Sequence, residues 1–144
     1  ASLRHRPEDF GADVREMLSS YSPGTTELMA GQRAVDALTA AMRTMLETVD
    51  VLVTPTTPIT APLIGQESVR YGSMEESVLG AMIRCTAPFN ATHLPALSLP
   101  CGFNRGGLPI GLQIAGRSFD EATVLRVGHA YEQATDWHLR SPVL

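Results

Sequence analysis

The most informative absence in this sequence is lysine, because all eleven basic residues of the 144-residue chain are arginines. The chain therefore cannot supply a lysine side chain as a catalytic base. Cysteine is scarce too, and the separation of Cys85 and Cys101 fits neither a metal-binding nor a redox motif. Since cysteine is among the most buried residue types, we expect both to be buried, reduced thiols.

Long apolar runs and clustered basic residues are also missing. No apolar stretch approaches the length that crosses a bilayer, and the polar N-terminus does not resemble a secretory signal. The net charge is −4, and no stripe of basic and aromatic residues indicates a nucleic-acid partner. The four histidines lack metal-ligand spacing, so the sequence predicts no metal site and no cofactor.

The most regular part of the sequence is Leu94–Gly116. Two apolar runs of strand length, Ala96–Leu99 and Ile110–Ala115, are bounded by glycine or proline. The connector contains Asn104 and the pair Gly106-Gly107, which tolerate positive φ angles. We therefore expect two neighbouring strands joined by a turn.

The sequence before and after this strand pair predicts one further strand and several helices. A short continuous apolar run, Asp50–Pro55, predicts a strand buried on both faces, and the proline-rich segment Thr56–Pro62 predicts a stiff loop. The resulting order of helices and strands is typical of an α/β fold with a mixed sheet. The length fits one domain or part of one. The helices are expected at Glu8–Leu18, Thr25–Val49, Met74–Cys85 and Asp120–Thr135.

Catalytic motifs are hard to find from the residues alone. The sequence Gly116-Arg-Ser118-Phe-Asp120 is only a near miss to the serine hydrolase motif Gly-x-Ser-x-Gly. Ser118 is better explained as a helix cap, since Glu121 follows three residues later in a capping-box pattern. A hydrolase built from serine, histidine and aspartate of this chain therefore has no motif in its favour.

Five short blocks stand out between positions 50 and 121, and each alone is unspecific. Together, in this order and spacing, they resemble the C-terminal part of the amidase-signature enzymes. The blocks are DVLVTPTTP at Asp50–Pro58, TAPFN at Thr86–Asn90, LPALSLPCGF at Leu94–Phe103, GLPIGLQIAGR at Gly107–Arg117 and FDE at Phe119–Glu121.

The resemblance implies that residues 1–144 are the C-terminal portion of a single α/β/α layered domain with a mixed sheet and no separate domains within the chain. The family hydrolyses amides, or transfers their ammonia, with a Ser-Ser-Lys triad in a Gly- and Ser-rich stretch. That stretch and its lysine are not found here. The resemblance therefore assigns no catalytic residue to this chain, and we expect the chain alone to be inactive.

The resemblance does assign pocket residues. The helix before the TAPFN block lines the substrate pocket in the family, which implies roles for Met82, Ile83 and Thr86. Glutamine-using members, the A subunits of tRNA amidotransferases, place an acidic residue at the position of Ile83, and an apolar side chain cannot pair with an ammonium group. Arg15 is a candidate for the arginine that binds the substrate carboxylate.

These implications lead to an expected function. We expect the chain to contribute sheet core and pocket to a cytoplasmic amidase that acts on a small uncharged or apolar amide. The alternatives are a glutamyl/aspartyl-tRNA amidotransferase A-subunit fragment and a non-catalytic scaffold or binding remnant. We also expect the isolated chain to self-associate, because an apolar sheet edge is a template for pairing.

Overall fold

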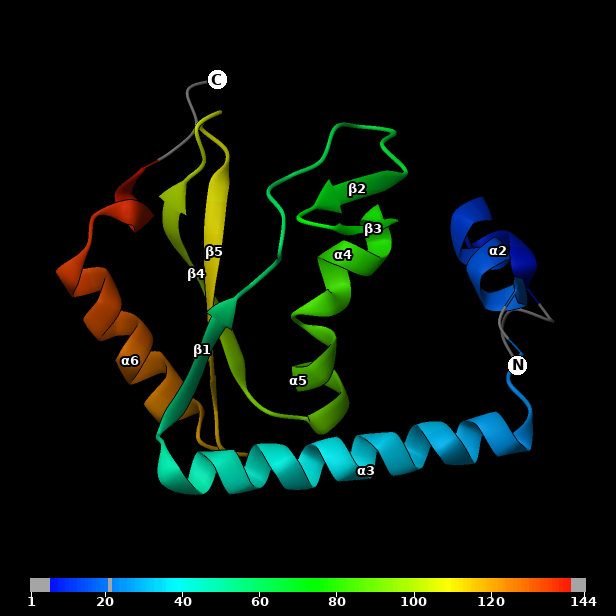
Figure 1. Cartoon of the computed structure of the whole chain (residues 1–144), viewed down its shortest axis with the longest axis horizontal. Coiled ribbons are helices and arrows are strands. Elements are labelled where there is room, and N and C mark those ends of the chain that lie inside the picture. Colours follow the sequence, from blue (N-terminus) through cyan, green and yellow to red (C-terminus); the bar gives the residue numbers. More distant parts are fainter. Residues whose placement is uncertain (1–5, 21, 141–144) are drawn as a thin grey trace. The chain divides into compact units, whose positions relative to one another are not determined.

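The structure is a computed structural model that describes residues 6–20 and 22–140 (Figure 1). It consists of two compact units, Ala1–Val35 and Asp36–Leu144. The division falls inside one continuous helix, and the expectation of no separate domains stays a prediction. The elements are η1 Pro7–Asp9, α2 Ala12–Ser20, α3 Thr25–Thr48, β1 Val51–Pro55, β2 Ser68–Tyr71, β3 Met74–Ser77, α4 Val78–Arg84, α5 Ala87–Thr92, β4 Ala96–Phe103, β5 Pro109–Gly116, α6 Glu121–Ala134 and η2 Trp137–Leu139.

The first unit holds η1, α2 and the beginning of α3. The predicted helix Glu8–Leu18 is interrupted near Gly11, so a short 3-10 turn precedes α2. Arg6 pairs with Asp9 across that turn at 3.0 Å. The long predicted helix is confirmed by α3, which begins at its first expected residue and ends one residue early.

The second unit is built on a three-stranded antiparallel sheet in the order β1-β5-β4. Strand β5 is central, with Thr54 opposite Gln113 on one side and Ser98 opposite Gln113 on the other. The fold class is confirmed, but every strand pair in the described residues is antiparallel, so the parallel pairing of a mixed sheet is not found there. The two predicted core strands are confirmed and are longer than expected.

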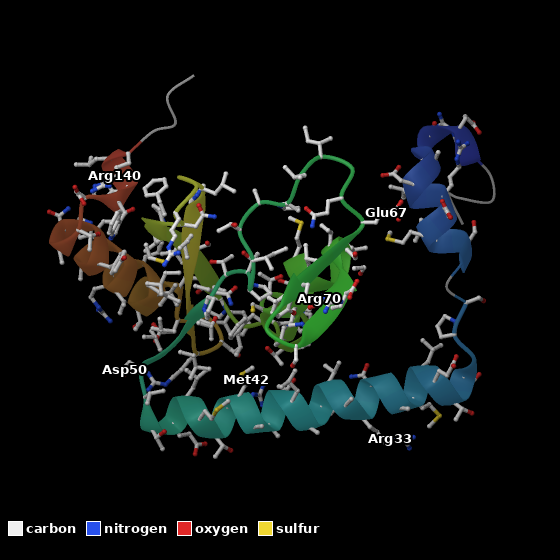
Figure 2. The ribbon with its side chains drawn as sticks, turned by 45° about the horizontal axis from the view of Figure 1, so that its top comes forward. Arg33, Met42, Asp50, Glu67, Arg70 and Arg140 are labelled. Carbon is white, nitrogen blue, oxygen red and sulfur yellow. The ribbon has the colours of Figure 1, made fainter. Side chains whose placement is uncertain are left out.

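Helices cover both faces of this sheet (Figure 1). On one face, α6 packs its Val124 against Leu99 and Ile114. Gly128 of α6 has no side chain at the point where Leu97 approaches, and a Cβ there would lie 2.5 Å from the leucine. On the other face, Leu46 of α3 and Phe89 of α5 form a second apolar cluster with neighbouring residues. Its remaining members are Leu94 and Ala115, with Met42 and Leu52 packed against them (Figure 2).

Some expected buried positions are exposed. Strand β1 is an edge strand, so Val53 is 56% exposed and the expectation of cover on both faces is wrong there. Leu125 lies outside the inward stripe of α6. Cys85 and Cys101 are free, as predicted, but only half-buried. Leu28 and Met45 of α3 are exposed, and so is Val49, which follows the end of the helix.

The predicted helix Met74–Cys85 is partly wrong. Its first four residues form β3, which pairs with β2 across a two-residue turn where Gly72 adopts a φ of 57°. The helix begins only at Val78, because the Ser77 side chain accepts a hydrogen bond from the Gly80 amide and caps it. The apolar spacing correctly predicted α4, but the predicted helix began about one turn too early.

The predicted capping box at Ser118 is also wrong. Asp120 is the N-cap of α6, and its carboxylate accepts from the Thr123 amide. Phe119, between Ser118 and the true cap, has a φ of 61°, which a bulky residue seldom adopts. Near the C-terminus, Trp137 of η2 packs against Phe103 at the end of β4, with the two ring centroids 6.1 Å apart.

Candidate functional site

The three pocket residues implied by the sequence lie close together in the second unit. Met82 and Ile83 are on α4 and are 46% and 49% exposed. Thr86 follows at the N-cap of α5 and is half-buried. With Leu79, 63% exposed, these positions repeat at the three- and four-residue spacing that defines one helix face. The result is an exposed apolar stripe ending in a hydroxyl group.

Arg15 has a different location. It lies exposed on α2 in the first unit, where its amide donates to the Gly11 carbonyl at 3.0 Å. The positions of the two units relative to one another are not determined. The structure therefore does not bring Arg15 together with the other three candidates, and its role stays a prediction.

The junction between α4 and α5 has a specific backbone geometry. The Ile83 carbonyl accepts from the Cys85 amide, the Thr86 amide at 3.1 Å and the Thr86 hydroxyl at 3.2 Å. These bonds close the end of α4, and α5 then begins with Pro88 in its first turn. Ile83 and Thr86 are thus fixed to each other by local hydrogen bonds.

A polar group of side chains lies on the sheet face opposite α6. Gln113 is 4% exposed, and its Nε2 donates to Thr54 Oγ1 and to the Cys85 carbonyl, both at 3.0 Å. Beside it, the hydroxyl groups of Thr56 and Ser98 lie 2.7 Å apart. Sequence reasoning missed this group. Its signal was a single amide residue, Gln113, inside an otherwise apolar strand.

The β2–β3 hairpin is joined to α4 by a charged cluster. Arg84 donates to both carboxylate oxygens of Glu76, at 2.9 and 2.6 Å, and the Tyr71 hydroxyl also donates to that carboxylate. The hydrogen bonds from Arg84, then that from Tyr71, lower the pKa of Glu76. The same carboxylate raises the pKa of Tyr71 and of Arg84. A second pair, Arg70 with Glu75, lies exposed on the hairpin (Figure 2).

A separate open pocket of about 330 Å³ lies near the end of α3 and contains none of the predicted site residues. Its Arg117 donates to the Leu46 carbonyl at 2.8 Å and the Val49 carbonyl at 2.9 Å, and it pairs with Asp50. Those carbonyls are at the end of α3, where backbone acceptors lack partners within the helix. Arg117 therefore has a structural role at this pocket. The lining residues are Arg43, Leu46, Glu47, Leu94, Arg117 and Ser118.

Metal sites and membrane-spanning helices are absent from the described part of the chain. No group of three or more histidine, cysteine, aspartate or glutamate residues among residues 6–20 and 22–140 has the arrangement of a metal site. No helix in those ranges combines the length and the apolar character needed to cross a membrane.

Comparison with known families decides the affiliation. The family model described as Amidase matches residues 3–125. The chain belongs to this amidase family. The amidase blocks identified in the sequence lie within the matched residues, so the resemblance and the fold class are confirmed.

The amidase relatives are much longer than this chain. The A subunit of a glutamyl-tRNA(Gln) amidotransferase from Synechococcus sp. is 44% identical over 98% of this chain and 30% of its own length. An amidase from Pseudomonas putida is 42% identical over 99% of this chain and 31% of its own length. The chain thus spans about 30% of the relatives it matches.

Solved enzyme structures show the same fold. A crystal structure of an amidase has a TM-score of 0.80 and 31% identity, and the match covers 92% of this chain and 30% of that one. A 6-aminohexanoate cyclic dimer hydrolase has a TM-score of 0.70 and 29% identity, over 83% of this chain and 26% of that one. The sheet and its helical layers therefore correspond to part of a larger enzyme fold.

The Glu76 cluster predicts a pH dependence of stability. Because the pKa of Glu76 is lower in the folded chain than in the unfolded one, the unfolded chain binds more protons in acid. The stability from this carboxylate is complete above the ordinary value of 4.5 and is lost as the pH falls through the lowered pKa. We expect Glu76→Gln to reduce the difference between urea midpoints at pH 6 and pH 3.

The matched control is Glu75→Gln, which removes the exposed pair with Arg70 and leaves the Glu76 cluster intact. Urea unfolding followed by circular dichroism measures both variants. Equal pH dependence in wild type and Glu76→Gln would contradict the role of the cluster.

Proposed function

We propose that this chain is the C-terminal part of a longer amidase, which hydrolyses an uncharged or apolar carboxylic amide to the acid and ammonia or an amine. The observation that carries the proposal is the family match over residues 3–125 in a chain that spans about 30% of its relatives. The catalytic Ser-Ser-Lys residues would lie upstream. The chain contributes the antiparallel sheet and a wall of the substrate pocket.

The absence of lysine from this chain supports the proposal that the catalytic residues lie upstream. A serine hydroxyl is a weak nucleophile until a base activates it, and in the proposed mechanism that base is a neutral lysine acting through a second serine. All the basic residues of this chain are arginines, which stay protonated and make poor bases. The chain alone is therefore proposed to be inactive. A cytoplasmic location also stays a prediction.

The exposed stripe on α4 supports an apolar substrate. Met82 and Ile83 present apolar surface to solvent beside the Thr86 hydroxyl, and no carboxylate occupies this face of the helix. A substrate with a free ammonium group would find no opposite charge here. An uncharged acyl or aryl group would instead bury apolar area against these side chains.

The second candidate function is that of an amidotransferase A subunit. It is favoured by the 44% identity to the glutamyl-tRNA(Gln) amidotransferase protein from Synechococcus sp.. The 42% identity to the Pseudomonas putida amidase is nearly equal, so identity alone does not separate the two. Ile83 favours the amidase. A non-catalytic scaffold or binding remnant is the third candidate.

The first test is the mass of the native polypeptide that contains this chain, followed by assay of the purified protein on an aromatic amide and on glutamine. We expect a polypeptide about three times as long, with lysines and a Gly/Ser-rich stretch upstream, that prefers the aromatic amide. A native chain that begins at residue 1 would exclude catalysis by the Ser-Ser-Lys mechanism. Preference for glutamine would show that the interpretation of Ile83 is wrong.

The pocket assignment predicts the effect of a charge at Ile83. In the full-length enzyme, Ile83→Asp should lower kcat/KM for the aromatic amide about ten- to a hundredfold, because the apolar contact is replaced by a carboxylate. The control is Leu125→Asp on α6, where the original residue is 58% exposed and lies on the opposite side of the sheet. Equal losses in both variants would remove Ile83 from the pocket.

We also propose that the isolated chain self-associates. Strands β1 and β4 are the edges of the three-stranded sheet in the described part of the chain, and unpaired strand edges invite pairing with another copy. Ala96 is exposed at the start of β4. We expect light scattering to give a mass above that of one chain, and Ala96→Lys to shift it toward the monomer.

The control for this experiment is Ala130→Lys, which adds the same charge at an exposed position on α6, away from the sheet edge. It should leave the association unchanged. A monomeric wild-type chain at high concentration would contradict the proposal.

A further inference from the structure

The starting observation is a buried amide in an apolar strand. Gln113 is 4% exposed on β5, the central strand, and its neighbours Leu112 and Ile114 both belong to the cluster beneath α6. Burying an amide costs free energy unless its hydrogen bonds are made. Among the described residues, no buried side-chain nitrogen or oxygen lacks a partner, so this requirement is met.

The partners of Gln113 come from two different elements. One hydrogen of Nε2 is donated to Thr54 Oγ1 on the neighbouring strand, which adds a cross-strand contact. The other is donated to the carbonyl of Cys85, 28 residues earlier in the chain. That carbonyl lies at the end of α4, where backbone carbonyls lack donors from the helix itself. Gln113 therefore joins the sheet to the α4–α5 junction.

The junction carries the residues of the proposed pocket wall. Ile83 and Thr86 lie two residues before and one residue after Cys85 and are hydrogen-bonded to each other. Consecutive Cα atoms are about 3.8 Å apart, so a displacement of the Cys85 carbonyl is transmitted directly to both. The hydrogen bond from Gln113 is therefore a direct polar link between this junction and the sheet, beside the apolar packing of Phe89.

We propose that Gln113 is a positioning residue for substrate selection, because it holds the Cys85 carbonyl and so fixes Ile83 and Thr86 relative to the sheet. This inference rests on the proposed function as an amidase. Gln113 acts through the junction and needs no contact with the substrate. Its removal should change which amides are accepted more than it changes the rate of the chemical step.

The decisive variants are Gln113→Met and Thr54→Val in the native polypeptide that contains this chain. Methionine has nearly the shape of glutamine but donates no hydrogen bond, so it releases the Cys85 carbonyl while filling the same volume. Thr54→Val removes the other partner of the same Nε2 and leaves the bond to Cys85 in place. Gln113→Met loses both hydrogen bonds of Nε2, whereas Thr54→Val loses only the bond to Thr54, so the bond to the Cys85 carbonyl is what distinguishes the two variants.

Two measurements are made on each variant. The first is amide hydrogen exchange of the peptide that covers Leu79–Asn90, which should become about tenfold faster in Gln113→Met and stay near wild type in Thr54→Val. The second is the ratio of kcat/KM for a bulky and a small apolar amide. We expect this ratio to change about tenfold in Gln113→Met, mainly through KM, and to stay constant in Thr54→Val.

The outcomes separate the inference from the function on which it rests. An active wild-type enzyme whose two variants behave alike in both measurements would overturn the positioning role alone. A wild-type polypeptide without amidase activity would overturn the proposed function, and with it the role in substrate selection, whatever the exchange data show. Faster exchange and altered selectivity confined to Gln113→Met would establish the role.

Discussion

The pairing of β5 with strands on both sides is the constraint on which the second unit depends. The register aligns Leu52, Ala115 and Ala96 across the sheet, and two residues further along it aligns Thr54, Gln113 and Ser98. Because side chains alternate between the faces of a strand, both rows lie on the same face, and a slip of one residue would turn a strand's side chains to the opposite face. The register therefore decides both where Leu46 and Phe89 pack and where the polar group lies.

The sequence predicted the parts of the fold whose signal is local and repeated. Helix α3 extends over 24 residues of good helix formers, and β4 and β5 are bounded by glycine and proline, so their positions follow from pattern alone. The β2–β3 hairpin was missed because Met74 and Glu75 fit the periodicity of the following helix. What begins that helix is the Ser77 side chain, whose capping role depends on a backbone geometry that the pattern does not show.

The candidate site was predictable to a different degree. The resemblance to amidases assigns pocket roles to Met82, Ile83 and Thr86, which the structure places close together, and those roles stay a prediction. The contacts of Gln113 could not be predicted, because the Cys85 carbonyl is 28 residues away and becomes available only where α4 ends. A lone amide in an apolar strand was a usable signal, but its partner required the tertiary structure.

Three arginines of the second unit make contacts that a lysine could not reproduce. Arg117 binds two carbonyls at the end of α3, and Arg84 binds both oxygens of Glu76. The guanidinium of Arg140, which Figure 2 labels, lies 4.5 Å from the centroid of the Trp137 ring. Each contact uses the planar, forked shape of the guanidinium group, whereas a lysine ammonium is a single point charge. The replacement of arginine by lysine, commonly treated as conservative, is therefore not conservative at these three positions.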